Sequence, residues 1–265
     1  MLVDSHCHLD FKVLNNKLEH IISKARESNV NVLQTICTQI SDFNTIYQIS
    51  RSSDNIFCSI GNHPLNVVHE GIVETKEILK YTVLNNLIGI GETGLDYHTK
   101  DSKKSQQISF INHIIAAQES SLPLIIHTRL AEQDTINIIK NHMKIKNFTG
   151  VIHCFTASDW FARECLNLGL YISASGIITF KNAKKIQEIF KTIPLEKILI
   201  ETDSPYLAPV PMRGKDNQPS YLKYTAKYMA ELLEIDFNHL AKQTTKNFFD
   251  LFKKAKYNPV TKSIK

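Results

Sequence analysis

Short apolar runs recur along the 265-residue chain, and segments with helical spacing separate them. Eight runs are rich in Val and Ile and have the length of strands, at 2–6, 31–37, 56–61, 87–92, 122–127, 150–155, 170–175 and 197–202. Helical periodicity is found at 17–28, 42–52, 72–85, 103–120, 131–146, 158–168, 181–192, 220–234 and 236–252. Near-continuous apolar strands are typical of a parallel sheet covered on both faces. Eight such units in this length predict an α/β fold, a single (β/α)8 TIM barrel.

An open, doubly wound sheet is the alternative architecture. No G-x-G-x-x-G motif follows the first apolar run, which disfavours the dinucleotide-binding version of that fold. The segment 204–219, SPYLAPVPMRGKDNQP, interrupts the pattern and holds four of the eight prolines. Long loops inside a compact domain are usually functional. We therefore expect one domain over 1–252, with this loop after the last strand.

The composition of the chain indicates which cellular compartment to expect. The apolar runs are too short to span a bilayer, which takes about 20 residues, and the N-terminus lacks the pattern of a signal peptide. The five cysteines form no C-x-x-C pair, which argues against a disulfide framework and for a reducing compartment. We expect a cytoplasmic protein that does not bind a membrane. Nothing in the pattern specifies an oligomeric state.

The formal net charge of +5 is concentrated near the end of the chain. The segment 253–265 contains five lysines and no acidic residue. Without these five, 26 basic residues remain against 26 acidic ones. We expect a basic, flexible, solvated tail over 253–265, and a body without an extended basic surface.

Metal-binding residue types stand at the ends of the predicted strands. In VDSHCHLD (3–10), His6 and His8 share one face of a strand. Later strands end in GNHP, GETGLDY, IIHTR, IHCF and ETDSPY, which contain His63, Glu92, His127, Arg129, His153, Glu201 and Asp203. In a barrel, all carboxyl ends of the strands meet at one mouth. Imidazoles and carboxylates in this number predict a site for divalent ions such as Zn, Mn, Co or Ni.

These stretches, in this order, resemble the TatD-type deoxyribonuclease family of metal-dependent hydrolases. The resemblance extends from Asp4 to about Phe252 and rests on DSHCHLD, GNHP, GETGLDY, LPLIIHTR, HCF, ETDSPYLAP and RGKDNQP. It implies a TIM barrel that uses two divalent metal ions (Zn, Mg or Mn) to hydrolyse phosphoesters. By the same resemblance, one ion is held by His6, His8 and Asp203, the other is held by His127 and His153, and both are bridged by Glu92.

Catalytic roles follow for two of these carboxylates. We expect Glu92 to fix the separation of the ions, and Asp203 to accept a proton from the attacking water. Glu201 shares the strand face of Asp203 and is expected to orient a neighbour.

The substrate-binding residues are expected on the rim of the mouth. Arg129 and Arg213 follow barrel strands, where a planar guanidinium suits a phosphate. We expect both to bind substrate, together with His63. A tyrosine in the same rim, Tyr97 or Tyr206, could stack a base or pack within its loop. The helical histidines, among them His113, are predicted to lie on the surface.

The leading functional hypothesis is a deoxyribonuclease that cleaves phosphodiester bonds by a two-metal activated water, with DNA single strands or ends as substrate. The first alternative is a metal-dependent hydrolase of an ester or amide, such as an aminoacyl-tRNA linkage or a small molecule. The second is a non-catalytic metal-binding barrel. The complete ligand set argues against the second alternative, and the two rim arginines favour a phosphate over a neutral amide. The metal, DNA against RNA, and exonuclease against endonuclease action stay open.

Overall fold

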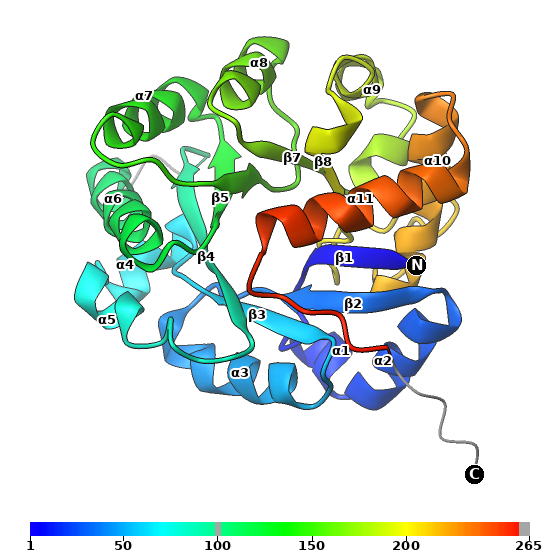
Figure 1. Cartoon of the computed structure of the whole chain (residues 1–265), viewed down its shortest axis with the longest axis horizontal. Helices are drawn as coiled ribbons and strands as arrows, with labels where there is room; N and C mark the ends of the chain where they lie inside the picture. The colour runs from blue at the N-terminus through cyan, green and yellow to red at the C-terminus, as the bar shows by residue number, and fades with distance from the viewer. Residues whose placement is uncertain (99–101, 260–265) are drawn as a thin grey trace.

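The structure, a computed structural model, describes residues 1–98 and 102–259. Eight parallel strands pair in chain order and form a barrel surrounded by helices (Figure 1). The strands are β1 (Leu2–Cys7), β2 (Val30–Thr35), β3 (Ile56–Ile60), β4 (Leu87–Asp96), β5 (Leu124–Arg129), β6 (Gly150–Ile152), β7 (Tyr171–Ala174) and β8 (Ile198–Ile200). The predicted TIM barrel is thus confirmed. A strand order that never reverses excludes the doubly wound sheet.

Eight helices lie within the predicted helical segments: α2 (Leu18–Glu27), α3 (Phe43–Arg51), α6 (Lys103–Ser120), α7 (Glu132–Met143), α8 (Asp159–Asn167), α9 (Lys184–Phe190), α10 (Leu222–Leu232) and α11 (Phe237–Leu251). The predicted helix over 72–85 is reduced to α5 (Thr75–Leu79). Two β-branched residues, Thr82 and Val83, follow it, and the Thr82 hydroxyl bonds to the carbonyl of Leu79, an alternative to continued helix. Two short helices, α1 (Lys12–Asn15) and α4 (Val67–Glu70), were not predicted.

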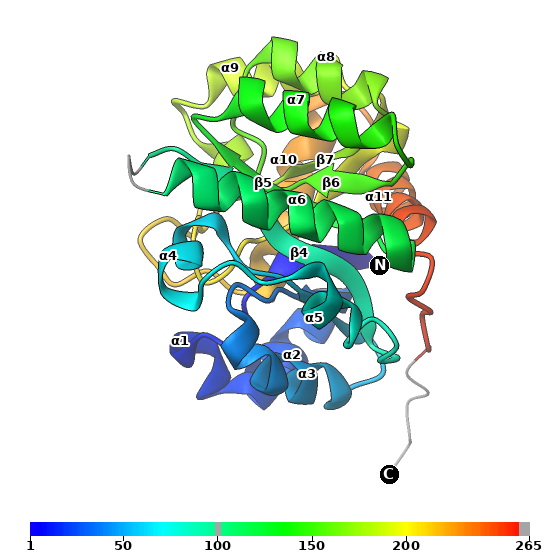
Figure 2. The ribbon, with the colours of Figure 1, turned by 90° about the vertical axis from the view of Figure 1, so that its left-hand side faces the viewer.

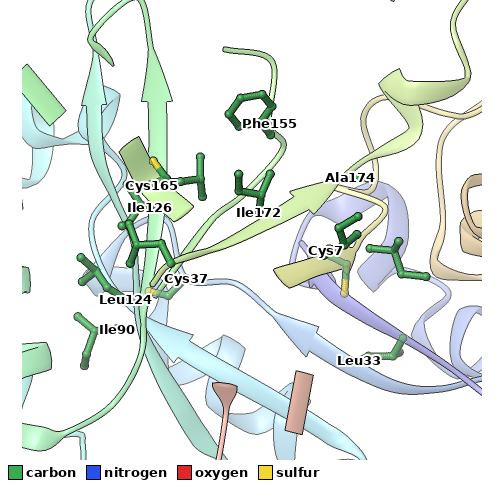
Figure 3. Packing of buried hydrophobic residues seen from close by; sticks show 14 of the residues in the cluster. Cys7, Leu33, Cys37, Ile90, Leu124, Ile126, Phe155, Cys165, Ile172 and Ala174 are labelled. Atoms are coloured by element: carbon green, nitrogen blue, oxygen red, sulfur yellow. The ribbon is translucent and has the colours of Figure 1, made fainter. Parts of the chain in front are cut away.

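The main hydrophobic core lies between the strands and the surrounding helices. Its side chains include Ile90, Leu124, Ile126 and Ile172 from the strands, packed with residues such as Phe155 (Figure 3). All five cysteines are free, and four of them are fully buried. Burial raises the pKa of these thiols, so they act as small apolar residues.

A second core fills the amino end of the barrel. Helix α11 lies across this end (Figures 1 and 2). Phe248 of the helix and Phe252, which directly follows it, pack among strand residues such as Val3 and Ile125. All candidate chemistry is therefore left to the opposite end, where the strands finish.

The contacts of the barrel continue past residue 252. Ala255 is buried, and the Lys254 ammonium donates to the carbonyls of Thr82 and Leu84. These contacts anchor the first half of the segment 253–265 instead of leaving it solvated. Residues 260–265 lie outside the described residues. Across 1–98 and 102–259, no helix has the length and apolar character needed to cross a membrane. The cytoplasmic location stays a prediction.

The ring closes between the carboxyl ends of β1 and β8. There the backbone N–H of Asp203 donates to the carbonyl of His6 (2.9 Å), and the N–H of His8 donates to the carbonyl of Ser204 (2.8 Å). Cys7 and Ser204 form an isolated parallel bridge. These contacts hold the chain that leaves β8 directly beside the chain that leaves β1.

A buried carboxyl group reinforces this closure. Asp4 accepts the backbone N–H of Thr202 (2.9 Å) and its hydroxyl (2.6 Å). Burial raises the pKa of Asp4 to about 7, although both hydrogen bonds act to lower it. A polar group excluded from water is costly unless it is paired, so this pair favours the closed arrangement over a separated one.

Phe252→Ala should lower the free energy of unfolding by about 3–5 kcal/mol, because it leaves a cavity where a fully buried ring packs. Denaturant unfolding measures the loss, with Phe249→Ala as the control, since Phe249 is only partly buried. Metal content should not change, because the ring lies at the opposite end from the predicted mouth. A loss below about 1 kcal/mol would contradict the packing role of α11.

Candidate metal centre

The structure brings all six predicted ligands together at the carboxyl end of the barrel. One lies in β1 and one directly after it, one each lies in β4 and β5, and the others stand shortly after β6 and β8: His6, His8, Glu92, His127, His153 and Asp203. Five of them line a cavity of about 460 Å³, and the sixth, His6, is buried beneath it.

The first group consists of His6, His8 and Asp203, whose ligand atoms all lie within 4.8 Å of one another. Asp203 Oδ1 lies 3.3 Å from His8 Nε2 and 3.6 Å from His6 Nε2. The backbone bond between Asp203 and His6 explains this placement, because it fixes the two chain segments side by side. His6 and His8 thus form one compact donor set with Asp203, which lies almost two hundred positions later in the chain.

The second group forms around one oxygen of Glu92. Its Oε1 lies 2.7 Å from His153 Nε2 and 3.0 Å from His127 Nδ1, and these two nitrogens are 3.2 Å apart. The other oxygen, Oε2, faces His6 Nε2 at 3.4 Å. Each carboxylate oxygen therefore faces a different donor group, the arrangement expected of a bridging ligand.

Glu92 is ionised in this environment. Its burial acts to raise the pKa of the carboxyl, but the imidazoles of His153, His63 and His127 hold that pKa well below its usual range. A buried carboxylate amid several imidazoles is an electrostatic pattern common at functional sites.

Two glycines allow β4 to approach β5 closely around Glu92. Gly91 and Gly94 have φ values of +127° and +144°, in the region where side chains are strained. A Cβ on Gly91 would collide with the carbonyl of Ile125, and one on Gly94 would collide with that of His127. The GETG stretch thus permits the backbone contact that brings Glu92 and His127 together.

Further carboxylates hold the imidazoles in place. Glu201 Oε1 accepts the backbone N–H of Cys154 (2.6 Å) and lies 3.5 Å from His153 Nδ1. Asp96 Oδ2 lies 3.2 Å from His127 Nε2. Such partners orient metal-binding histidines. The position of Glu201 fits its predicted orienting role, whereas Asp96 was missed although it belongs to the GETGLDY stretch.

The residues fit a divalent cation. Within the described part of the chain, the buried ring nitrogens that lack a hydrogen-bond partner include both nitrogens of His6 and Nδ1 of His8. Buried polar atoms without a partner are rare and costly, and a cation bound to His6 would remove part of this cost. Imidazoles combined with carboxylates suit the borderline divalent metals.

His63 stands beside the second group but differs from its members. Its Nδ1 accepts the backbone N–H of Leu65 (3.2 Å), and its Nε2 lies 3.4 Å from Glu92 Oε1. Burial lowers the pKa of His63 to about 4. A neutral ring whose Nδ1 accepts must carry its proton on Nε2. That proton faces Glu92 Oε1, and His63, Glu92 and His127 also offer ligand atoms that lie within 4.8 Å of one another. The substrate-binding role of His63 therefore stays a prediction.

The two predicted arginines are placed differently. Arg129, the last residue of β5, lines the cavity together with His63. Arg213 does not line it: its guanidinium stacks 3.9 Å above the Phe180 ring and donates to the carbonyl of Ala208. The structure thus brings His63 and Arg129 to the mouth but leaves Arg213 apart, and the phosphate contact of Arg213 stays a prediction.

His113 does not lie on the surface as predicted. It is fully buried, its Nε2 accepts the backbone N–H of Asn62 (3.1 Å), and its Nδ1 lies 2.7 Å from the carbonyl of Ser109. Burial lowers the pKa of His113 to about 4. The spacing of Phe110, His113, Ile114 and Ala117 on one helix face could have revealed this burial.

Tyr97 is also tied into the protein. Its hydroxyl donates to Asp134 (2.7 Å) and accepts from Gln107 (2.8 Å). These bonds favour the packed interpretation of Tyr97 over base stacking.

Solved structures share this fold. A TatD homologue from Escherichia coli k12, YJJV, superposes with a TM-score of 0.89 at 24% identity, covering 95% of this chain and 98% of that one. A TatD family hydrolase from Entamoeba histolytica gives 0.82 at 21% identity, covering 95% and 97%.

Curated relatives share a higher sequence identity with this chain than these solved structures do, and a family model matches most of its length. An uncharacterized metal-dependent hydrolase from Buchnera aphidicola subsp. Baizongia pistaciae is 44% identical over 97% of each chain. YcfH from Escherichia coli, with the same description, is 40% identical over 95% of each, and YabD from Bacillus subtilis is 39% identical over 96% of this chain and 99% of that one. The model described as TatD related DNase matches residues 3–253. The chain therefore belongs to the TatD-related family of metal-dependent hydrolases.

Proposed function

We propose that this metal-dependent hydrolase is a deoxyribonuclease that cleaves phosphodiester bonds with two divalent metal ions. The observation that carries the proposal is the position of Glu92, with one oxygen toward His6 and the other toward His127 and His153. In this proposal His6, His8 and Asp203 would hold one ion, His127 and His153 would hold the other, and Glu92 would contribute to both. Zn, Mg and Mn are the candidate metals. When bound, two such ions lower the pKa of water and neutralise charge on a phosphoryl group.

The chain's own residues supply positioning and proton transfer. Asp203 accepts a proton from the attacking water and later delivers it to the leaving oxygen. The Nε2–H of His63 donates a hydrogen bond to a phosphate oxygen, and the planar guanidinium of Arg129 donates to a second one. Glu201 keeps the His153 ring in its orientation. The substrate we favour is DNA as single strands or ends, because the body has no net basic charge to follow a long duplex.

A cleavage panel tests this proposal. Purified protein is loaded with one defined metal at a time and offered 5′- and 3′-labelled single strands, duplexes, generic phosphodiesters, carboxylic esters and amides. Cleavage of DNA phosphodiesters supports the proposal. Cleavage of esters or amides alone, for instance an aminoacyl ester, would replace it with the alternative hydrolase.

Metal content should identify the two sites. His6→Ala combined with His8→Ala should reduce the bound metal from two ions to about one, because the first donor group loses its imidazoles. Elemental analysis after dialysis measures the stoichiometry. His20→Ala combined with His69→Ala, two exposed histidines, is the matched control and should retain both ions. Full metal content in the first variant would contradict the assignment.

Asp203→Asn should fold normally and lower turnover by roughly 10²–10⁴, the effect of a lost general acid–base group. Asn keeps a ligating oxygen but cannot accept the proton. Turnover is measured together with metal content, and Glu201→Gln is compared in parallel. Glu201→Gln should cost less, because that side chain only orients His153. A larger loss from Glu201→Gln, or near-normal turnover of fully loaded Asp203→Asn, would assign proton transfer to another group.

Arg129→Ala should raise the KM for a DNA strand while metal content stays unchanged. The salt dependence of binding should be shallow, on the order of two to four released counterions in the wild type, and should fall by about one in the variant. Arg213→Ala is the comparison, because its guanidinium stacks on Phe180 outside the cavity. A larger effect from Arg213→Ala than from Arg129→Ala would indicate that the phosphate is bound by the loop 204–219 instead.

A further inference from the structure

Two cavities meet at a pair of aromatic side chains beside the candidate metal centre. The cavity at the mouth and a neighbouring one of about 730 Å³ share four lining residues: Phe11, Thr38, Asn66 and Tyr206. The rings of Phe11 and Tyr206 are nearly perpendicular, with centroids 5.9 Å apart. Tyr206 is 54% exposed. The pair thus forms a wall that the contents of both cavities can touch.

Each aromatic residue is attached to a proposed metal ligand by a short turn. The backbone N–H of Phe11 donates to the carbonyl of His8 (3.3 Å), and that of Tyr206 donates to the carbonyl of Asp203 (3.0 Å). The Phe11 ring also stacks on the His8 imidazole, at 4.9 Å between centroids. The aromatic pair therefore lies at a fixed offset from the reacting centre.

Buried hydrogen bonds hold Tyr206 in this exposed position. The fully buried Asn217 side chain donates to the carbonyls of Thr202 (2.8 Å) and Tyr206 (2.6 Å). Its backbone N–H donates to the carbonyl of Pro205 (3.0 Å). A single exposed aromatic ring is ordinary, but a ring on a backbone fixed beside a reacting centre forms a partly preorganised contact surface.

The charges around the mouth decide what this surface can receive. The second cavity is lined by Asp10, Asp42 and Asp216 against one cation, Lys12, which disfavours a phosphate there. Arg129 stands at the end of β5, on the far side of the ring from the junction of β1 and β8. A nucleic acid would therefore direct its backbone toward Arg129 and a planar, uncharged group toward the aromatic pair.

We propose that Tyr206 stacks the unpaired base next to the scissile phosphodiester, that the perpendicular Phe11 ring contacts the side of this base, and that the second cavity receives its outer edge. The inference rests on the proposed phosphodiesterase function and adds a specificity surface to it. Every base presents a π-face to an aromatic ring, and exocyclic amines would donate to the carboxylates behind the pair. The faces of a base within a duplex are covered by the neighbouring bases and cannot contact the aromatic ring. The arrangement therefore selects unpaired nucleotides.

Dinucleotides with one phosphodiester test the stacking, because the position of the scissile bond is then known. Deoxycytidylyl-(3′→5′)-deoxycytidine, whose bases carry exocyclic amines, is compared with analogues that lack the 5′ or the 3′ base, using wild-type protein and Tyr206→Ala. The wild type should lose about 10- to 100-fold in kcat/KM when the stacked base is absent. Tyr206→Ala should lose a similar factor on the complete dinucleotide and little more on the abasic analogue.

Controls separate stacking from damage to the site. Trp160→Ala removes another exposed ring, on α8, and should change nothing, while metal analysis of Tyr206→Ala should give wild-type content. Equal losses of Tyr206→Ala on complete and abasic substrates, or no loss at all, would overturn the inference. If the wild type cleaves neither the dinucleotide nor the labelled strands of the cleavage panel, the proposed function fails. Whenever the dinucleotide is not cleaved, calorimetry of the binding of the complete and abasic dinucleotides tests the stacking contact separately. Equal affinities would overturn the contact, and weaker binding of the abasic dinucleotide would support it.

Discussion

The junction between β1 and β8 is the constraint on which the rest of the site depends. The backbone hydrogen bond from Asp203 to His6 is one of the contacts that close the barrel, and it also sets two candidate ligands side by side. The same junction carries the turns that begin at His8 and Asp203 and position Phe11 and Tyr206. Closure of the barrel, the first group of ligands and the aromatic wall therefore depend on the same contacts. A shift of β8 against β1 would disturb all three.

The positions of the remaining ligands depend on the close approach of neighbouring backbone segments rather than on closure of the barrel. Gly91 and Gly94 allow β4 to contact β5, and Glu92 lies between them. This contact places an ionised carboxylate among imidazoles that are themselves buried. Charged and polar groups in such a place are costly without partners, which explains the surrounding carboxylates of Asp96 and Glu201.

The sequence was sufficient for the features that repeat or that mark strand ends. Eight apolar runs predicted the barrel, and the convergence of all strand ends predicted that His6 and Asp203 lie at one mouth. The grouping of these two residues as ligands of one ion came from the resemblance to the TatD-type family. Features that depend on side-chain direction were beyond such reasoning. Arg213 follows a barrel strand as Arg129 does, yet its loop turns the guanidinium onto Phe180. His113 was misjudged because a helical histidine was read without the apolar residues that share its face.

Under the proposed function, the distribution of charge at the mouth would account for action on a polyanion by a chain whose body has no net charge. A long basic surface would bind many phosphates and would depend steeply on salt. Here the cation Arg129 lies on one side of the metal centre, and the carboxylates of Asp10, Asp42 and Asp216 lie beyond the other. Such a mouth attracts one phosphate and repels the next one in the opposite direction. Orientation of the substrate then comes from a few local contacts, with the aromatic wall between the two charged regions receiving the part of a nucleotide that has no charge.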